Sequence, residues 1–546
     1  MRRTLVVLFI LGLAFSLTAQ TPTRAQSNAL IVAGRFVDVI TLDPGRAFET
    51  TNLIVHHATY ETLLNINADD LSKIVPGLAE SYSISEDGLE YTFVLNPNAK
   101  FASGNPVTAE DVRFSWTRLL NIKGGPSSYL RDFGFKSIEV VDERTVKVTL
   151  ESPQPAFASV VTAPALSVLE KAVVVAQGGT DAEDADQTDA AKDWLDQNSA
   201  GSGPFILTRW SPNSEIVMVR NENYWRGPVA LEGITLRVTN DAASALQLVA
   251  RGDADVALGV DADTAEQARN NPDLKLNIGQ TLNLLYLGIS PSDFFNLPIS
   301  DVRVRQAIAH ALDYDGIIAL TGGFADRPAA MLPLGISGSD PNLRYTRNLD
   351  KARELLAEAG YPDGFSMTLF IGGGSTAGVP REVIAAKIQA DLAEVGIQLE
   401  INQQTSPNFL TAFRAQELPM VISAWTPDYL DATMWTAFFS KAESGVSRRL
   451  RMDEPKLAEL ADQIAAERDP MVRERLLTEY VKAHVEAAVF IPLLQEQYID
   501  VLRSNVQGYV FHPVYLTEFA GILRHDPRRR RVSAGAAPDG RGEVIR

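Results

Sequence analysis

The chain has 546 residues, of which 45% are hydrophobic and 22% charged, and its formal net charge is −18. Because this length exceeds what one hydrophobic core normally holds, we expect two or three lobes. The acidic balance argues against nucleic acid as a partner. The absence of cysteine excludes disulfides, zinc–thiolate sites and cysteine nucleophiles.

The beginning of the chain has the pattern of a secretory signal peptide, which we place at 1–25. Arg2 and Arg3 precede an apolar run over 5–17, and small residues follow. We expect cleavage after Ala25, with Ala19 as the second choice. A membrane anchor is the alternative, but an apolar run of about 13 residues is short for a span.

Two turns and one helix cap stand out in the first third of the chain. Alternating runs flank the Asp-Gly pair at 87–88 and the Asp-Glu pair at 142–143, and they predict two β-hairpins. Thr108, with Asp111 three residues later, predicts a capped helix between the hairpins.

Other segments of the N-terminal half have less specific patterns. A β-rich segment covers 28–44, and apolar residues at helical spacing predict a helix within 54–67. The acidic stretch 177–199 is poor in apolar residues, so we expect an exposed loop or insertion with some helix. Strand-like alternation returns over 201–210 and 214–227, and a helix is expected from Ala242 to Ala250.

The C-terminal half alternates strands with helices. Strands are expected at 282–290, 365–371, 397–403, 418–425 and 490–503. Helices are expected at 300–320, 348–360, 381–396, 406–416 and over most of 454–490. This series indicates an α/β layer with a parallel or mixed sheet. The last residues, 524–546, contain four consecutive arginines and predict a disordered tail, with contact to an acidic surface as the alternative.

No catalytic or metal-binding motif is found in the sequence. The adjacent pair His56 and His57 is a poor chelate, because helical ligands need a spacing of three or four residues. The glycine-rich stretch 372–378 follows a strand and precedes a helix, so a phosphate cradle is conceivable. It lacks the lysine and the dinucleotide spacing, which favours a flexible or ligand-lining turn.

Eight stretches of the chain resemble the family 5 extracellular solute-binding proteins of ABC importers, the peptide- and nickel-binding type. They include "VRNENYWRG" and "AWTPDYLDA", and they occupy 75–116, 201–210, 219–227, 285–290, 301–318, 348–365, 424–432 and 491–495. Each stretch alone is weak, but together they follow the family's order over about 30–523. The resemblance therefore covers nearly the whole mature chain.

The resemblance implies an α/β fold, the two-lobe periplasmic-binding-protein clamshell of type II, in its large class with an extra subdomain and with mixed sheets flanked by helices. Lobe one would take 26–283 plus 497–523, with the extra subdomain at about 50–195. Lobe two would take 284–496, and hinge closure would trap a ligand between the lobes.

The function implied by the resemblance is capture of a small solute, a di- or oligopeptide, and its delivery to an ABC permease. The protein would need no cofactor, perform no chemistry, act as a monomer and lie in the periplasm. It would diffuse freely, because a lipobox cysteine is absent. The same fold could instead bind an oligosaccharide, an opine-like solute or a nickel chelate. A secreted hydrolase and a chaperone-like protein are the alternatives from other classes.

Asp428 is the first candidate for contact with ligand. A carboxylate among aromatic residues needs a partner, and the resemblance implies that Asp428 pairs with the α-ammonium of a peptide. Its alternative role is in a type I turn with Pro427. Trp425 and Tyr429 flank it and could stack on ligand or pack in the core. Asp431 is expected to cap the following helix.

A ligand carboxylate would need a positive partner, and the resemblance points to Arg414 and Arg381. Both lie in regions where peptide-binding relatives place a basic residue. A solvated surface arginine is the alternative for each. Arg303 and Arg305 belong to a family signature that we interpret as structural ion pairing.

Overall fold

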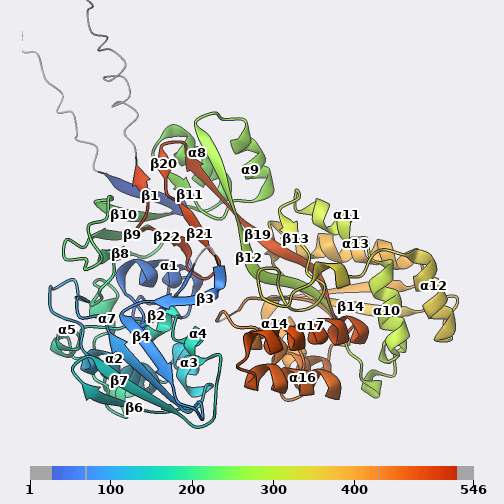
Figure 1. The fold of residues 1–546 in the computed structure, drawn as a ribbon. Coiled ribbons are helices and arrows are strands. Elements are labelled where there is room, and N and C mark those ends of the chain that lie inside the picture. The colour runs from blue at the N-terminus through green and yellow to red at the C-terminus, as the bar shows by residue number, and fades with distance from the viewer. Residues whose placement is uncertain (1–27, 68–69, 428, 525–546) are drawn as a thin grey trace, which may run out of the picture.

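The computed structural model describes residues 28–67, 70–427 and 429–524 (Figure 1). The predicted signal peptide at 1–25 lies outside the described residues, as do Asp428 and the predicted tail apart from Arg524. The described part contains one large mixed sheet and a smaller antiparallel sheet, with helices packed on both.

The large sheet runs through the molecule from one end to the other (Figure 1). Its strand order is β17-β14-β18-β12-β19-β11-β1-β10-β9-β8, with β13 paired to β19. The central strands β12 (Leu274–Ile289) and β19 (Phe490–Arg503) are the longest and belong to both ends of the sheet. The others are β1 (Ala29–Gly34), β8 (Phe205–Ser211), β9 (Glu215–Arg220), β10 (Gly233–Val238), β11 (Val256–Ala257), β13 (Ala325–Asp326), β14 (Ser366–Gly372), β17 (Gln398–Gln404) and β18 (Met420–Trp425).

The two central strands change register at the middle of the sheet. Their regular pairing stops at Gln280 and resumes at Leu284. The side chain of Gln495, which is 0% exposed, fills this interruption. Its Nε2 donates to the carbonyls of Thr281, at 2.6 Å, and Leu334, at 3.0 Å. Residues 281–283 of β12 therefore have no ladder partner in β19, whereas Glu496 of β19 pairs with Ala325 of β13.

At the N-terminal end of the sheet, helices cover both faces. Helices α8 (Ala242–Arg251) and α9 (Ala262–Arg269) pack on one face. Helix α1 (Thr50–Thr59) packs on the other face, together with the last segment of the described chain. That segment forms β20 (Val506–Gln507), β21 (Val510–His512), β22 (Leu516–Glu518) and β23 (Leu523–Arg524).

The smaller sheet forms a subdomain beside this end, with its own hydrophobic core. Its strands are β4 (Ala79–Ile84), β5 (Glu90–Leu95), β7 (Thr145–Leu150) and β6 (Phe135–Asp142), in this order. Its helices are α2 (Ala109–Ile122), α3 (Ser128–Arg131), α4 (Phe157–Val160), α5 (Lys171–Ala176), α6 (Ala185–Thr188) and α7 (Lys192–Leu195). The hairpin of β2 (Leu64–Asn67) and β3 (Asp70–Pro76) lies between the subdomain and the central strands (Figure 1).

At the other end, the sheet separates two groups of helices. Alternate residues of β12 point to opposite faces, so Leu285 and Leu287 join one core while Leu284 and Tyr286 join the other. The first core contains α10 (Val302–Ala311), α11 (Tyr314–Leu320), α12 (Leu349–Glu358) and α13 (Arg381–Ala393). The second contains α14 (Ser406–Arg414), α15 (Thr433–Thr436), α16 (Pro455–Ala466) and α17 (Pro470–Ala487).

Several local predictions are confirmed. The two hairpins form as β4–β5 and β6–β7, and Gly88 in the first turn has the positive φ of 74° that favours glycine. Helix α2 begins at a complete capping box, in which Thr108 and Asp111 exchange hydrogen bonds.

Two predicted helices end earlier than their periodicity indicated. The helix predicted within 54–67 stops at Thr59, because the next residues pair with a distant strand: the amide of Leu78 donates to the carbonyl of Thr62 at 2.9 Å. The helix predicted at 300–320 is two helices, because Asp313 caps the second one by accepting from the amide of Gly316 at 3.0 Å.

The prediction of an exposed acidic loop at 177–199 is wrong in one respect. Two of its carboxylates are buried, since Asp189 pairs with Arg118 at 2.8 Å and Asp196 accepts from Thr41 at 2.6 Å. Composition alone could not show that these charges have partners elsewhere in the chain. The glycine-rich stretch 372–378 contains the two-residue strand β15 (Ser375–Thr376), which pairs with β16 (Val379–Pro380) just after it.

Candidate functional site

A cavity of about 300 Å³ separates the subdomain from the helices of the second core. Tyr129, Phe133 and Gln154 line it from the subdomain, and Tyr429 and Phe438 line it from the opposite side. The rings of Phe133 and Tyr429 meet edge to face, with centroids 5.1 Å apart. Tyr429 therefore lines one wall of the cavity and contacts the opposite wall, which a distant part of the chain forms.

The segment "AWTPDYLDA" begins at the carboxyl end of strand β18. Trp425 packs its ring against Phe438 and Phe439, at centroid distances of 5.2 and 5.4 Å. Its indole Nε1 is buried and has no hydrogen-bond partner. The Tyr429 hydroxyl lies 3.2 Å from the Thr433 hydroxyl. Asp428, between them, lies outside the described residues.

Asp431 has the structural role that the sequence predicted, and a second one as well. Its Oδ1 accepts from the amide of Thr433 at 2.9 Å, at the start of α15. The same carboxylate receives two hydrogen bonds from Arg473, at 2.6 and 2.9 Å. A bidentate partner of opposite charge satisfies the carboxylate fully, so Asp431 has no charge left to offer a ligand.

Arg381 is a half-buried cation that forms no ion pair with the residues that the structure describes. Its Nη1 makes one long contact, 3.4 Å, to the carbonyl of Gly373, and its Nε is buried without a partner. Burial lowers the pKa of its guanidinium. Arg381 also begins helix α13, where the helix dipole disfavours positive charge. Its position therefore costs stability that a bound anion would restore.

A second half-buried arginine, Arg449, was not predicted from the sequence. Its guanidinium lies 5.5 Å from the ring centre of Phe413, and it forms no ion pair with any described residue. Burial lowers the pKa of this guanidinium too, and nearby Arg414 lowers it further. Arg414 itself is exposed at the end of α14. Arg449 lies in the short 3-10 helix Ser447–Leu450, beside exposed Arg448, so only its tertiary surroundings distinguish it from a surface residue.

Arg303 and Arg305 are structural, as their sequence signature indicated. Arg303 binds Asp301, with Nη2 2.5 Å from Oδ2. Arg305 is 3% exposed and donates to backbone carbonyls, including those of Ile299, at 3.1 Å, and Ala487, at 3.0 Å. These contacts tie α10 to its neighbours.

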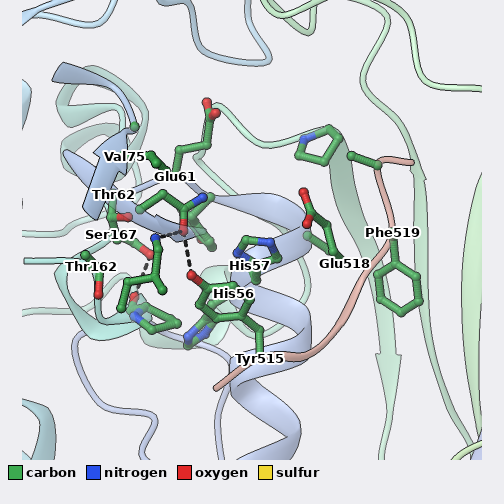
Figure 2. A pocket seen from close by; sticks show the side chains of 18 of the residues that line it. His56, His57, Glu61, Thr62, Val75, Thr162, Ser167, Tyr515, Glu518 and Phe519 are labelled. Atoms are coloured by element: carbon green, nitrogen blue, oxygen red, sulfur yellow. Dashed lines mark hydrogen bonds between the residues drawn. The ribbon is translucent and has the colours of Figure 1, made fainter. Parts of the chain in front are cut away.

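Another cavity, of about 400 Å³, lies beside α1 and β22 (Figure 2). Glu61 and Glu518 reach it from distant parts of the chain, and burial raises the pKa of both carboxyls. Glu61 accepts from the indole of Trp225 at 2.6 Å and from Arg226 at 2.9 Å. Because Arg226 neutralises Glu61, the wall carries only the excess charge of Glu518. The cavity is also lined by aromatic side chains, including Tyr515 and Phe519, but none of its lining residues comes from 284–496.

The family model described as "Bacterial extracellular solute-binding proteins, family 5 Middle" matches residues 73–445. The chain belongs to this family. It is 27% identical over 518 residues to the probable D,D-dipeptide-binding periplasmic protein DdpA of Escherichia coli, with 92% of this chain and 96% of that protein covered.

Solved structures extend the comparison for this family 5 binding protein. HbpA2 from Haemophilus parasuis is 27% identical, with a TM-score of 0.81 over 91% of this chain and all of that one. The periplasmic binding protein DppA from Helicobacter pylori, in complex with the peptide STSA, is 25% identical, with a TM-score of 0.71 over 91% and 98% of the two chains. The predicted clamshell fold is therefore confirmed.

Membrane-spanning helices and clusters of metal ligands are both absent from the described ranges. No helix within 28–67, 70–427 and 429–524 is long and apolar enough to cross a membrane. The same part of the family 5 protein contains no group of three or more histidine, aspartate and glutamate side chains that could hold a metal ion.

Proposed function

We propose that this protein is the extracytoplasmic solute-binding component of an ABC importer, and that it binds di- or oligopeptides between two lobes. The relatives named as dipeptide-binding, and the neighbour solved with a bound peptide, support this assignment. The observation that carries it is Arg381, a half-buried cation without an anionic partner at the carboxyl end of a parallel strand pair. Open α/β sheets place their ligands at such strand ends.

The lobes in this proposal are those expected from the sequence. Lobe one is 26–283 plus 497–523, with the subdomain at about 50–195, and lobe two is 284–496. The register change in β12 and β19 lies at both proposed crossings. A hinge needs a few residues that can change their backbone angles, and residues released from a ladder meet that need.

The proposed ligand contacts are Asp428 for the peptide ammonium, Trp425 and Tyr429 for its apolar groups, and Arg381 and Arg414 for its carboxylate. Tyr429 is supported by its place on a cavity wall. Trp425 is supported by its buried, unpaired indole Nε1, which could donate to a peptide carbonyl. Arg414 is the weakest member, because it is exposed.

The proposed function includes a location, an oligomeric state and a membrane partner. It would act as a monomer in the periplasm, perform no chemistry and deliver its solute to a membrane permease. Native mass spectrometry of the purified protein, before and after denaturation, tests the ligand class. A retained peptide is the expected result, whereas a retained oligosaccharide, opine-like solute or nickel chelate would replace the peptide in the proposal.

We expect Asp428→Asn to weaken peptide binding by roughly 10- to 100-fold, because a hydrogen bond to a charged group contributes about 1.5–3 kcal/mol. Calorimetric titration with a retained peptide measures the effect. Asp193→Asn is the matched control, since the side chain of Asp193 is 99% exposed. Equal affinities for the two variants would remove Asp428 from the site.

Closure of the lobes would be assisted by a contact at the rim of the cleft. Arg468, between α16 and α17, donates to the carbonyl of Glu86 in the β4–β5 turn at 2.8 Å. We expect Arg468→Ala to weaken ligand binding about two- to tenfold, because this bond joins the two proposed lobes and would be lost when they separate. Small-angle scattering should give a larger radius of gyration for the Arg468→Ala variant than for the parent protein. Exposed Arg475 on α17 provides the control, Arg475→Ala, which should change neither quantity.

A further inference from the structure

Hydrogen-bond donors without acceptors are concentrated on one face of the sheet in the proposed lobe two. Tyr286 pairs with Ser423, and Leu284 with Trp425, so the side chains of these four residues share that face. The Trp425 indole Nε1 and the Arg381 Nε are both buried and unpaired. Such groups cost free energy unless an acceptor arrives.

Arg449 adds a second full charge to the same face. Tyr286, which is 1% exposed, lies within electrostatic range of both guanidiniums: burial raises the pKa of its hydroxyl, while Arg449 and Arg381 act in the opposite direction. Arg449 lies over Phe413 in the core on this face. Arg381 is the first residue of α13, and its guanidinium approaches this face at the end of β14, where its Nη1 contacts the carbonyl of Gly373.

The charges on this face do not balance. Neither Arg381 nor Arg449 forms an ion pair within 28–67, 70–427 and 429–524, and both are half-buried. The C-terminal carboxylate of a peptide would neutralise only one of them. Closing a cleft over the other would leave an uncompensated cation, which is strongly unfavourable.

We propose that the ligand carries two carboxylates at this end, as a peptide whose C-terminal residue is itself aspartate or glutamate. One carboxylate pairs with Arg381, and the second pairs with Arg449, while the indole of Trp425 donates to a peptide oxygen. Exposed Arg414 adds positive potential beside them and attracts the anionic end as the ligand approaches. This inference rests on the proposed function, since it specifies the chemistry of the same ligand.

A peptide library tests the inference. Random di-, tri- and tetrapeptides would be offered in excess to the ligand-free protein, half of them ending in Asp or Glu and half in the isosteric Asn or Gln. Captured peptides would be identified by mass spectrometry after removal of unbound material. We expect enrichment of acidic ends by at least tenfold.

Variants at position 449 test the carboxylate that pairs with Arg449 independently of the one that pairs with Arg381. Arg449→Met should abolish the preference for acidic ends and strengthen binding of amide-ended peptides, because Arg381 still binds their carboxylate and no uncompensated cation remains. Arg449→Lys keeps the charge and should retain part of the preference. Arg448→Met, at the exposed neighbouring position, should behave as the unmodified protein.

Three results would overturn the inference, and they are distinguishable. Capture of acidic and amide ends in equal amounts would mean that both arginines share a single carboxylate, and peptide binding would still stand. Capture of no peptide at all would contradict the proposed function, and this inference with it. An unchanged acidic preference in Arg449→Met would also remove Arg449 from the site.

Discussion

Replacing Arg118 with methionine is expected to lower the free energy of unfolding by about 3–5 kcal/mol. Arg118 is 1% exposed and binds two carboxylates, Asp43 at 2.7 Å and Asp189 at 2.8 Å, both of them fully buried. Burial alone would raise the pKa of Asp189, but the hydrogen bonds and charge of Arg118 hold it below its usual value. Without Arg118, two buried carboxylates lose their main partner.

Urea denaturation followed by circular dichroism measures this loss. The control is Arg131→Met in the same subdomain, where Arg131 and Asp132 form an exposed pair at 3.0 Å. Exposed pairs contribute less than about 1 kcal/mol, so this variant should unfold almost as the parent does. If both variants lost equal stability, the buried ion pairs of Arg118 would contribute no more to stability than the exposed pair does.

Asp500 is expected to make the protein less stable as the pH rises from about 4 to about 7. The residue is 0% exposed, and burial raises the pKa of its carboxyl from 3.8 to about 7. The unfolded chain releases this proton near pH 4, whereas the folded chain keeps it until near pH 7. Because the folded state binds more protons in this interval, its stability falls as the pH rises, and the change ends above pH 7.

Asp500→Asn should remove that dependence. Each pH unit between the two values is worth roughly 1.4 kcal/mol, so the variant should gain about 4 kcal/mol relative to the parent between pH 4 and pH 7. Thermal unfolding of both proteins across this range gives the difference. The control is Asp350→Asn, at a side chain that is 97% exposed. The difference in stability between this variant and the parent should stay the same from pH 4 to pH 7. A constant difference for Asp500→Asn as well would mean that its carboxyl titrates normally.

The elements that could be predicted from sequence are those whose signals are local. The capping box of α2 and the Asp-Gly turn after β4 depend on residues three or four positions apart, and both formed as expected. The errors arose where a distant partner decided the outcome. The N-terminal half of β12 has the polar residues Lys275, Asn277 and Gln280, and it is a strand because β19 pairs with it.

Some residues of the candidate site could be named from the sequence and one could not. Tyr429 and Arg381 were named because their stretches resemble a family, and the structure describes one on a cavity wall and the other as an unpaired cation. Arg449 had no such signal, since it is one of three arginines within "SRRLR" and neighbouring Arg448 is exposed. Only the position of its guanidinium over the ring of Phe413 separates it from its neighbours.

The two long strands that run the length of the large sheet limit how this protein can evolve. A gene segment encoding either end alone would encode only half of β12 and half of β19, and each half-strand would expose an unpaired edge. Neither end can therefore be exchanged between proteins as a module. New ligand preferences must arise by substitution of individual side chains around a scaffold that is inherited whole.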